Sequence, residues 1–230
     1  MSNLGTKCLR KLWYTVNQPE KAEPLSWHVR LKFLYGDLVE ELVLFLAGVS
    51  GHSVEGRQEE LVLDGIEGHR DAILDGQLVD VKSASGYGFK KFRDGISPES
   101  DAFGYLTQLA AYKVAGGDDG KRDGAFVAVD KSTGEIHVDY HEVLPTEDIP
   151  GIIERAKQAV NLPEPPARGY KDEEDGKSGN RKLGTTCSYC QWKATCWPGI
   201  KGFAYSGGPR FLTKVERTPD VPEFKVWRPE

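Results

Sequence analysis

EGHRDAILDGQLVDVKSAS, residues 67–85, carries the clearest fold signal in the chain. Asp75-Gly76 separates two runs of alternating apolar and polar residues, and this pattern predicts a β-hairpin with a type I′ turn. If these two residues form the loop, Leu74 faces Gln77, Asp71 faces Asp80 and Lys82 faces His69. Because strand side chains alternate between faces, one side of the hairpin would be polar and the other apolar. The polar side contains His69, Asp71, Asp80 and Lys82, and the core side contains Ala72, Leu74, Val79 and Val81.

Two facing aspartates are unfavourable, because directly opposed residues in a hairpin have Cβ atoms only about 4.5–5.5 Å apart. A solvated strand pair could tolerate the repulsion. A Mg²⁺ or Mn²⁺ ion bound by both carboxylates would instead compensate it, since these ions prefer oxygen ligands. The hairpin therefore makes Asp71 and Asp80 candidate metal ligands.

Residues 29–47 predict a long helix that offers a third carboxylate. Glu40 lies opposite the main leucine stripe, but it is surrounded by apolar residues and Gly36, so we expect the helix to be buried on both sides. A buried glutamate needs a partner, and a metal ion is one. Glu41 is the rival candidate, although it lies near Asp37 on a more ordinary polar strip.

The ordered set of Glu40, Asp71, Asp80-Val81-Lys82 and Gln108-x-x-x-Tyr112 resembles the PD-(D/E)XK nuclease superfamily, in particular its RecB-like exonuclease branch. The resemblance covers roughly residues 30–130. It implies an α/β fold, with a mixed central sheet flanked by helices. Many RecB-like members have histidine where this chain has Glu40, which leaves the number of bound metals open.

The resemblance also implies roles for these residues. Glu40, Asp71, Asp80 and the backbone carbonyl of Val81 would bind one or two Mg²⁺ or Mn²⁺ ions. Lys82 would position the attacking water and offset negative charge in the transition state. Gln108 and Tyr112 would contact the substrate or brace the site; ordinary helix packing is the other interpretation of this pair.

The four cysteines are Cys8, Cys187, Cys190 and Cys196, three close together and one distant. Four thiolates suit a tetrahedral zinc site or a [4Fe–4S] cluster. The three-plus-one spacing favours iron–sulfur, because structural zinc more often uses two compact pairs. It is similar to the iron–sulfur RecB-like nucleases, including the CRISPR-associated adaptation exonuclease and AddB-type domains. A cluster here would close a loop of about 178 residues and act as a structural staple.

DNA contact would need local basic patches, because the formal net charge is −5. The sequence after Lys82 predicts a glycine-punctuated loop, in which aromatic and basic side chains could stack on unpaired bases and counter phosphates. These candidate DNA-binding residues are Tyr87, Phe89, Lys90, Lys91 and Arg93. A solvated loop with its aromatics folded beneath it is the alternative.

The rest of the chain predicts a helix over 97–115 with Ser97 as its cap, a second hairpin over 124–143, and a helix from 147 to 160. We expect one nuclease domain over 1–200, with its core at about 29–160, a linker at 162–182, and an irregular tail over 201–230. No stretch is apolar enough to span a membrane and the start lacks a signal-peptide pattern, so we expect a cytoplasmic protein with no membrane partner.

Together these patterns predict a metal-dependent DNA exonuclease with an iron–sulfur staple, acting on linear or single-stranded DNA. The expected setting is recombination, repair, CRISPR adaptation or viral DNA processing, with a recombination, helicase or CRISPR adaptation protein as partner; homo-oligomerisation stays open. One alternative is a catalytically silent, cysteine-cluster module that binds nucleic acid. The other is a structure-selective endonuclease on the same fold.

Overall fold

The computed structural model describes residues 1–117 and 121–229, and the chain forms two compact units. Unit 1 consists of Met1–Thr6 and Ser26–Arg155, and unit 2 of Lys7–Leu25 and Ala156–Glu230. The domain expected over 1–200 includes unit 1 and part of unit 2. Unit 2 combines an N-terminal segment with the C-terminal third of the sequence.

Unit 1 is a mixed α/β fold, as expected from the sequence. Its elements are α2 (Trp27–Val49), β1 (Val54–Glu55), β2 (Glu59–Leu63), β3 (Ile66–Arg70), β4 (Ala72–Leu74), β5 (Gln77–Ala84), α3 (Gly86–Arg93), α4 (Tyr105–Ala115), β6 (Gly124–Asp130), β7 (Ile136–His141) and the short 3₁₀ helix η2 (Thr146–Asp148). Helix α5 (Ile149–Val160) begins in unit 1 and ends in unit 2.

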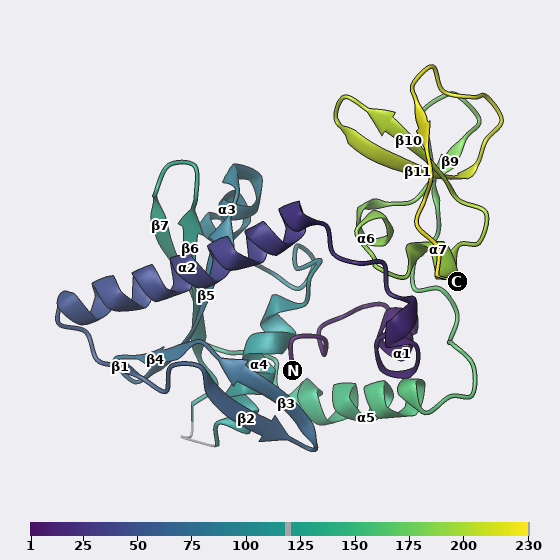
Figure 1. The fold of residues 1–230 in the computed structure, drawn as a ribbon. Coiled ribbons are helices and arrows are strands. Elements are labelled where there is room, and N and C mark those ends of the chain that lie inside the picture. Colours follow the sequence, from purple (N-terminus) through teal and green to yellow (C-terminus); the bar gives the residue numbers. More distant parts are fainter. Residues whose placement is uncertain (118–120, 230) are drawn as a thin grey trace. The chain divides into compact units, whose positions relative to one another are not determined.

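The central sheet of unit 1 has the strand order β1-β4-β5-β6-β7 (Figure 1). Strands β5 and β6 are parallel, and the other neighbouring pairs are antiparallel. Strands β6 and β7 form the second hairpin that the sequence predicts. Strands β2 and β3 pair separately as a two-stranded sheet, against which α4 packs.

The sheet has a helix on each side because β5 and β6 alternate apolar residues between both faces. On one face Val43 and Leu44 of α2 pack against Ala72, Val79, Val81, Ala125 and Val127. This is the apolar side predicted for the hairpin. On the opposite face Phe126 contacts Phe92 of α3 and Tyr105 of α4.

This part of the chain contains two Asp-Gly hairpin turns, of which the sequence analysis predicts one. Asp75 and Gly76 have φ of 49° and 80°, and they join β4 to β5 with Leu74 paired to Gln77, as predicted. Asp64 and Gly65 repeat the turn between β2 and β3, with φ of 52° and 78°. The second turn takes β3 away from β5, so the predicted pairing of Lys82 with His69 is wrong. His69 pairs with Glu60 on β2, and Lys82 pairs with Ala128 on β6.

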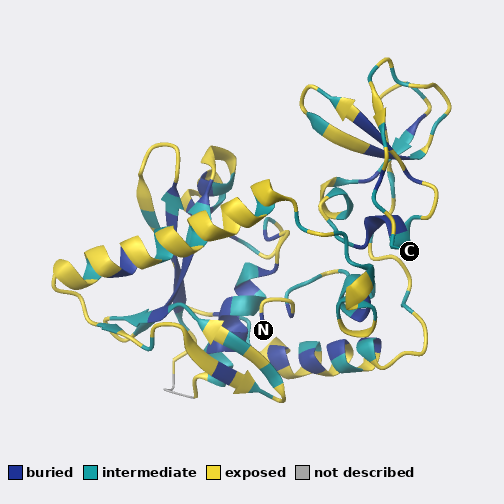
Figure 2. Ribbon diagram, viewed as in Figure 1, coloured by how far each residue is buried: buried dark blue, intermediate teal, exposed yellow. Residues whose placement is uncertain are grey.

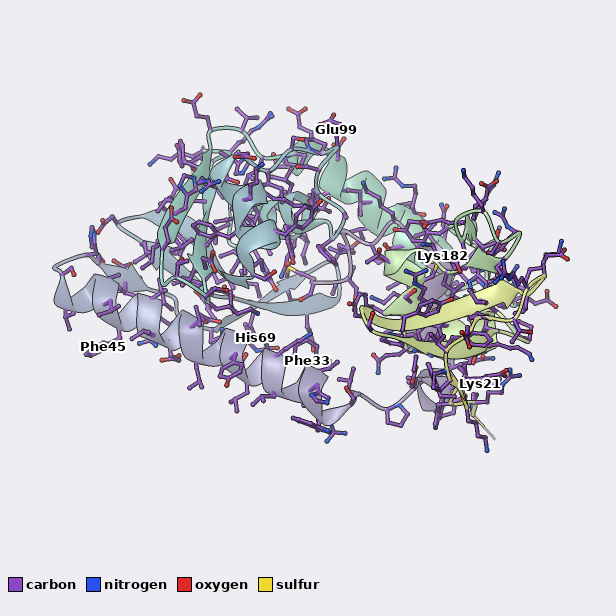
Figure 3. All side chains as sticks on the ribbon, turned by 90° about the horizontal axis from the view of Figure 1, so that it is seen from above. Lys21, Phe33, Phe45, His69, Glu99 and Lys182 are labelled. Carbon is purple, nitrogen blue, oxygen red and sulfur yellow. The ribbon has the colours of Figure 1, made fainter. Side chains whose placement is uncertain are left out.

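Helix α2 is buried on one side only, contrary to the expectation of burial on both sides. Its opposite face is apolar and exposed, and Figure 2 shows α2 as largely exposed along its length. We call this face the α2 outer stripe; its residues recur every three or four positions and are Trp27, Leu31, Leu34, Leu38, Leu42, Phe45 and Val49. Figure 3 shows Phe45 on the side of α2 that faces away from the sheet.

Two further local predictions are corrected. The expected loop after β5 is the helix α3. The helix expected from Ser97 begins at Tyr105, because the buried Asp101 carboxylate accepts hydrogen bonds from the backbone N–H groups of Phe103, Gly104 and Leu106. Gly104 has φ of 78° and lies so close to Gly5 that a Cβ on either would meet the other's backbone. A tight turn therefore replaces the first two turns of the predicted helix.

Unit 2 contains an antiparallel sheet where the sequence predicts an irregular tail. The strand order is β12-β10-β11-β9-β8. Its elements are α1 (Leu9–Asn17), η1 (Pro19–Lys21), β8 (Glu173–Glu174), β9 (Arg181–Lys182), α6 (Thr185–Ser188), α7 (Lys193–Cys196), β10 (Lys201–Tyr205), β11 (Gly208–Lys214) and β12 (Glu223–Phe224). Short strands rich in polar residues give little sequence signal, which is why this sheet was missed.

Among the helices of the described residues, none combines the length and the apolar character that crossing a bilayer requires.

Candidate functional site

The β4–β5 hairpin brings Asp71 and Asp80 together at the place where its pairing stops. The last paired residues are Ala72 and Val79, and Asp71 and Asp80 are next in that register. Asp71 lies outside the ladder, between β3 and β4. The chain thus separates the two strands where continued pairing would oppose two negative charges directly.

Asp80 is almost fully buried, with 3% of its surface exposed. It lies on the β5 face opposite α2, and its Oδ2 atom is an unbonded buried oxygen apart from an ion pair with the Lys82 ammonium. Burial alone would lower the pKa of Lys82, but the charges of Asp80 and Asp71 outweigh burial, and the net pKa is raised. Lys82 is therefore a fixed positive charge beside Asp80.

Asp71 interacts electrostatically with Asp80 and Glu40, and we call these three residues the acidic group. Its Oδ2 atom accepts a hydrogen bond of 2.7 Å from the backbone N–H of Val81, which fixes the side chain beside β5. Burial, followed by the charges of Asp80 and Glu40, raises the pKa of Asp71 to about 7. A carboxyl whose pKa is raised toward neutrality by burial and by neighbouring carboxylates is a typical functional-site feature.

Glu40 completes the group from the inner face of α2. Burial raises the pKa of Glu40, and a hydrogen bond from Gln58 partly opposes the shift, while Asp80 and other carboxylates add to it. The rival candidate Glu41 forms an ion pair with Arg57 and is well exposed. The structure therefore brings Glu40, and not Glu41, toward the two aspartates.

Gln58 is a residue of this site that the sequence reasoning missed. Its side-chain amide donates a 2.5 Å hydrogen bond to Glu40 Oε1, and its backbone N–H donates to the Asp71 carbonyl at 3.1 Å. Gln58 has φ of 48°, which a residue with a side chain adopts only at a cost. It links two of the three acidic residues, yet it precedes β2 without any motif that could have marked it.

Tyr105 is a second missed residue. The Lys82 ammonium lies 4.8 Å from the centre of the Tyr105 ring, within reach of a cation–π interaction. The ring also stacks on Phe92 and contacts the exposed Phe103. Tyr105 thus contacts Lys82, and it connects Lys82 to the neighbouring aromatic rings.

Gln108 and Tyr112 share one face of α4, but neither makes a hydrogen bond or ion pair with the acidic group within the described residues. Tyr112 is buried, and its ring lies where a Cβ on Gly68 of β3 would meet it at 3.1 Å. Gln108 is half-buried one turn earlier. Their geometry fits bracing of α4 against β3 better than direct contact with the carboxylates.

The expected DNA-contact residues divide into exposed and buried ones. Phe89 is 2% exposed and belongs to the core, so its predicted stacking role is wrong. It fails because helical spacing turns Phe89 and Phe92 inward together. Tyr87 is 80% exposed with the Lys91 ammonium 5.5 Å from its ring centre, and Lys90 and Arg93 are exposed on the same helix.

All four cysteines belong to unit 2 and are thiols rather than disulfides. They line one cavity with an empty volume of about 280 Å³, part of it open to solvent. Its other walls come from Arg10, Lys11, Tyr14, Trp192, Lys193 and Trp197. Burial and then the charges of Cys190, Cys196 and Cys8 raise the pKa of Cys187 to about 11.

Several contacts within unit 2 hold Cys8 near the other three cysteines. Trp13 donates a hydrogen bond to the Leu162 carbonyl at 2.8 Å, and Trp192 donates to the Gln18 carbonyl at 3.0 Å. Gly169 lies against the backbone of Cys8, so closely that a Cβ there would meet the Cys8 Cα at 3.1 Å. Four thiols gathered in this way offer the donor set of a soft metal or cluster.

Among the residues that the structure describes, no three or more His, Cys, Asp or Glu side chains already have the arrangement of a metal site. In the acidic group, ligand atoms are engaged within the protein: Asp80 Oδ2 with Lys82 and Asp71 Oδ2 with Val81. Metal binding would require these side chains to reorient. The donors nevertheless fit a hard divalent cation in unit 1 and a soft metal in unit 2.

No family model and no curated protein matches the sequence. Among solved structures, the chain is similar to the crystal structure of SSO0001, with a TM-score of 0.47 and 17% sequence identity. The similarity covers 85% of this chain and 83% of that chain.

Proposed function

We propose that the chain is a metal-dependent deoxyribonuclease of the PD-(D/E)XK type, with Glu40, Asp71 and Asp80 as ligands of Mg²⁺ or Mn²⁺. The observation that carries the proposal is the gathering of these three carboxylates beside the half-buried Lys82, which forms an ion pair with Asp80. Burial, followed by the charges of Asp80 and Glu40, raises the pKa of Asp71 to about 7. Repulsion between neighbouring carboxylates destabilises a folded core, and a divalent cation bound between them would relieve it.

The residues divide the chemistry of phosphodiester hydrolysis among them. A bound divalent cation supplies Lewis-acid stabilisation of the phosphate and lowers the pKa of a bound water. Glu40, Asp71 and Asp80 would hold that cation, with the Val81 carbonyl as a further ligand. Lys82, whose pKa the charge of Asp80 raises, would donate hydrogen bonds as an ammonium to the water or to a phosphate oxygen.

Aromatic and basic side chains near the acidic group support DNA as the substrate. Helix α3 follows β5 directly and exposes Tyr87, Lys90 and Arg93. Phe103 is 66% exposed and contacts Tyr105, which in turn supports Lys82. Exposed rings beside cations can stack on unpaired bases and counter phosphates, which supports linear or single-stranded DNA as the substrate. Exonucleolytic cleavage is what the resemblance to the RecB-like branch implies.

In this proposal the four cysteines of unit 2 bind a [4Fe–4S] cluster, with structural zinc as the alternative. The cluster has a structural role, since no titratable residue of the acidic group belongs to unit 2. Recombination, repair, CRISPR adaptation or viral DNA processing, and partners from such systems, are settings compatible with this activity.

The deciding experiment is cleavage of end-labelled single- and double-stranded linear DNA, beside a closed circle, with Mg²⁺, Mn²⁺ or chelator. We expect metal-dependent loss of the linear substrates and sparing of the circle. Glu40→Gln and Asp80→Asn should each lower the cleavage rate by at least about 100-fold, because each removes a charged ligand of the cation.

Glu41→Gln is the matched control, since it makes the same chemical change one residue away but outside the acidic group. It should retain cleavage. Equal loss in Glu40→Gln and Glu41→Gln, or activity that survives Asp80→Asn, would contradict the proposed site. DNA binding without cleavage in any metal would favour the catalytically silent module, and cutting of the closed circle would favour the endonuclease.

A further inference from the structure

The α2 outer stripe is an apolar surface larger than a single folded unit normally exposes. Trp27 is 67% exposed, Phe45 60% and Leu38 55%. With about 150–250 Å² on each aromatic side chain and somewhat less on each leucine, the stripe and its flanking residues expose roughly 1,000 Å². Monomeric proteins rarely expose a contiguous apolar patch beyond a few hundred Å².

The exposed area of the α2 outer stripe matches what a protein partner with an apolar helix would cover. A standard protein–protein interface takes about 800 Å² from each side, so this one face is sufficient for a stable complex. The stripe is straight: its spacing of three and four residues averages to the period of a single helix and runs through all 23 residues of α2. A second straight apolar helix of the same length would cover it completely.

Charges on α2 favour a second copy in the antiparallel direction. The first part of the helix carries Arg30 and Lys32, and its middle carries Asp37, Glu40 and Glu41. An antiparallel pair centred between Leu34 and Leu38 places Arg30 of one copy beside Glu41 of the other. A parallel pair would place like charges side by side, which is unfavourable.

We propose that this chain forms a homodimer through the α2 outer stripe, with two α2 helices packed antiparallel. Leu34 and Leu38 lie at the two-fold centre, and Trp27 of each copy packs near Phe45 of the other. Glu40 lies on the opposite face of α2, so the dimer leaves the acidic group uncovered. The inference does not depend on the proposed nuclease activity.

The test is sedimentation velocity of the full chain over a range of micromolar concentrations, with Leu38→Glu beside the wild type. We expect a dimer for the wild type, and dimerisation weakened by at least about 100-fold in Leu38→Glu, because a charge would be buried at the centre of both copies. Val138→Glu is the matched control, since Val138 is 56% exposed on β7 of the same unit. It should remain dimeric.

A photo-crosslinking residue at position 38 provides a second readout that does not involve the cysteines. In the proposed pair it should link two copies to each other, and the same residue at position 138 should not. A wild-type monomer at every concentration would overturn the proposal. So would a dimer that Leu38→Glu leaves intact, because another surface would then hold it together.

Discussion

The two candidate sites differ in how easily their ligand residues ionise at neutral pH. In unit 1 three carboxylates lie close together, and the pKa of Asp71 rises only to about 7, so its carboxyl can ionise near neutral pH. In unit 2 four thiols share a cavity, and burial raises the pKa of Cys187 to about 11, so Cys187 stays a thiol at neutral pH unless a metal replaces its proton. Carboxylates that can ionise near neutral pH suit a cation that binds and dissociates reversibly. Buried thiols suit a metal that remains bound.

The largest effect should come from the cysteines. We expect Cys187→Ser to abolish iron or zinc binding and to destabilise unit 2 by several kcal/mol, because structural metal binding is coupled to folding. Metal content, calorimetry and cleavage measured together would separate the two units. Ser188→Ala, at the next position in α6, should keep both the metal and the stability.

Four iron atoms and four sulfides per chain would identify the cluster, and one zinc ion would identify the alternative. A melting curve that Cys187→Ser leaves unchanged would contradict the contrast between the sites. It would mean that the thiols do not bind a structural metal.

A smaller effect is expected from the pH dependence of stability in chelator. The carboxyl of Asp71 ionises near 3.8 in the unfolded chain and near 7 in the folded one, so the free energy of unfolding falls as pH rises through that window. Asp71→Asn removes this fall, and Asn can still accept the hydrogen bond from Val81. At pH 8 the variant should be more stable than the wild type by about 1–3 kcal/mol. Each pKa unit corresponds to about 1.4 kcal/mol, and coupling between Asp71 and its carboxylate neighbours reduces the part that Asp71→Asn removes.

Near pH 4 the two proteins should have the same stability. Added Mn²⁺ should reverse the order at pH 8, because only the wild type keeps the full set of ligands. A variant that is less stable than the wild type in chelator at pH 8 would contradict a pKa of Asp71 raised by burial and by the charges of Asp80 and Glu40.

The smallest effect concerns Gln58, which positions Glu40 without binding metal itself. Gln58→Ala should weaken Mn²⁺ affinity by about 10-fold, as expected when a group that orients a ligand is lost. It should also move the pH at which Mn²⁺ binds upward, because the hydrogen bond from Gln58 lowers the pKa of Glu40. Calorimetric titration with Mn²⁺ at several pH values measures both.

Arg57→Ala is the control for Gln58, because it breaks the neighbouring contact to Glu41 outside the acidic group. If the two variants bind Mn²⁺ equally well, Gln58 has no positioning role.

Much of the candidate site follows from local sequence rules. The Asp75-Gly76 turn sets the register because only a few residues tolerate positive φ, and the register brings Asp71 close to Asp80. The helical period places Glu40 opposite the leucine stripe. Gln58 and Tyr105 could not be found in this way, since they join the site through a strained turn and a ring contact that no spacing encodes.

The sequence by itself therefore determined the central hairpin, the long helix and the approach of Asp71 to Asp80, because these depend on backbone preferences and periodicity within a few residues. Only the tertiary structure decided that Glu40 rather than Glu41 faces the aspartates, that Phe89 is core, and that the final segment forms a sheet. It also decided which side of α2 is covered. An apolar stripe is the same in sequence whether a sheet, another chain or water lies against it, and burial depends on contacts between residues far apart in the chain.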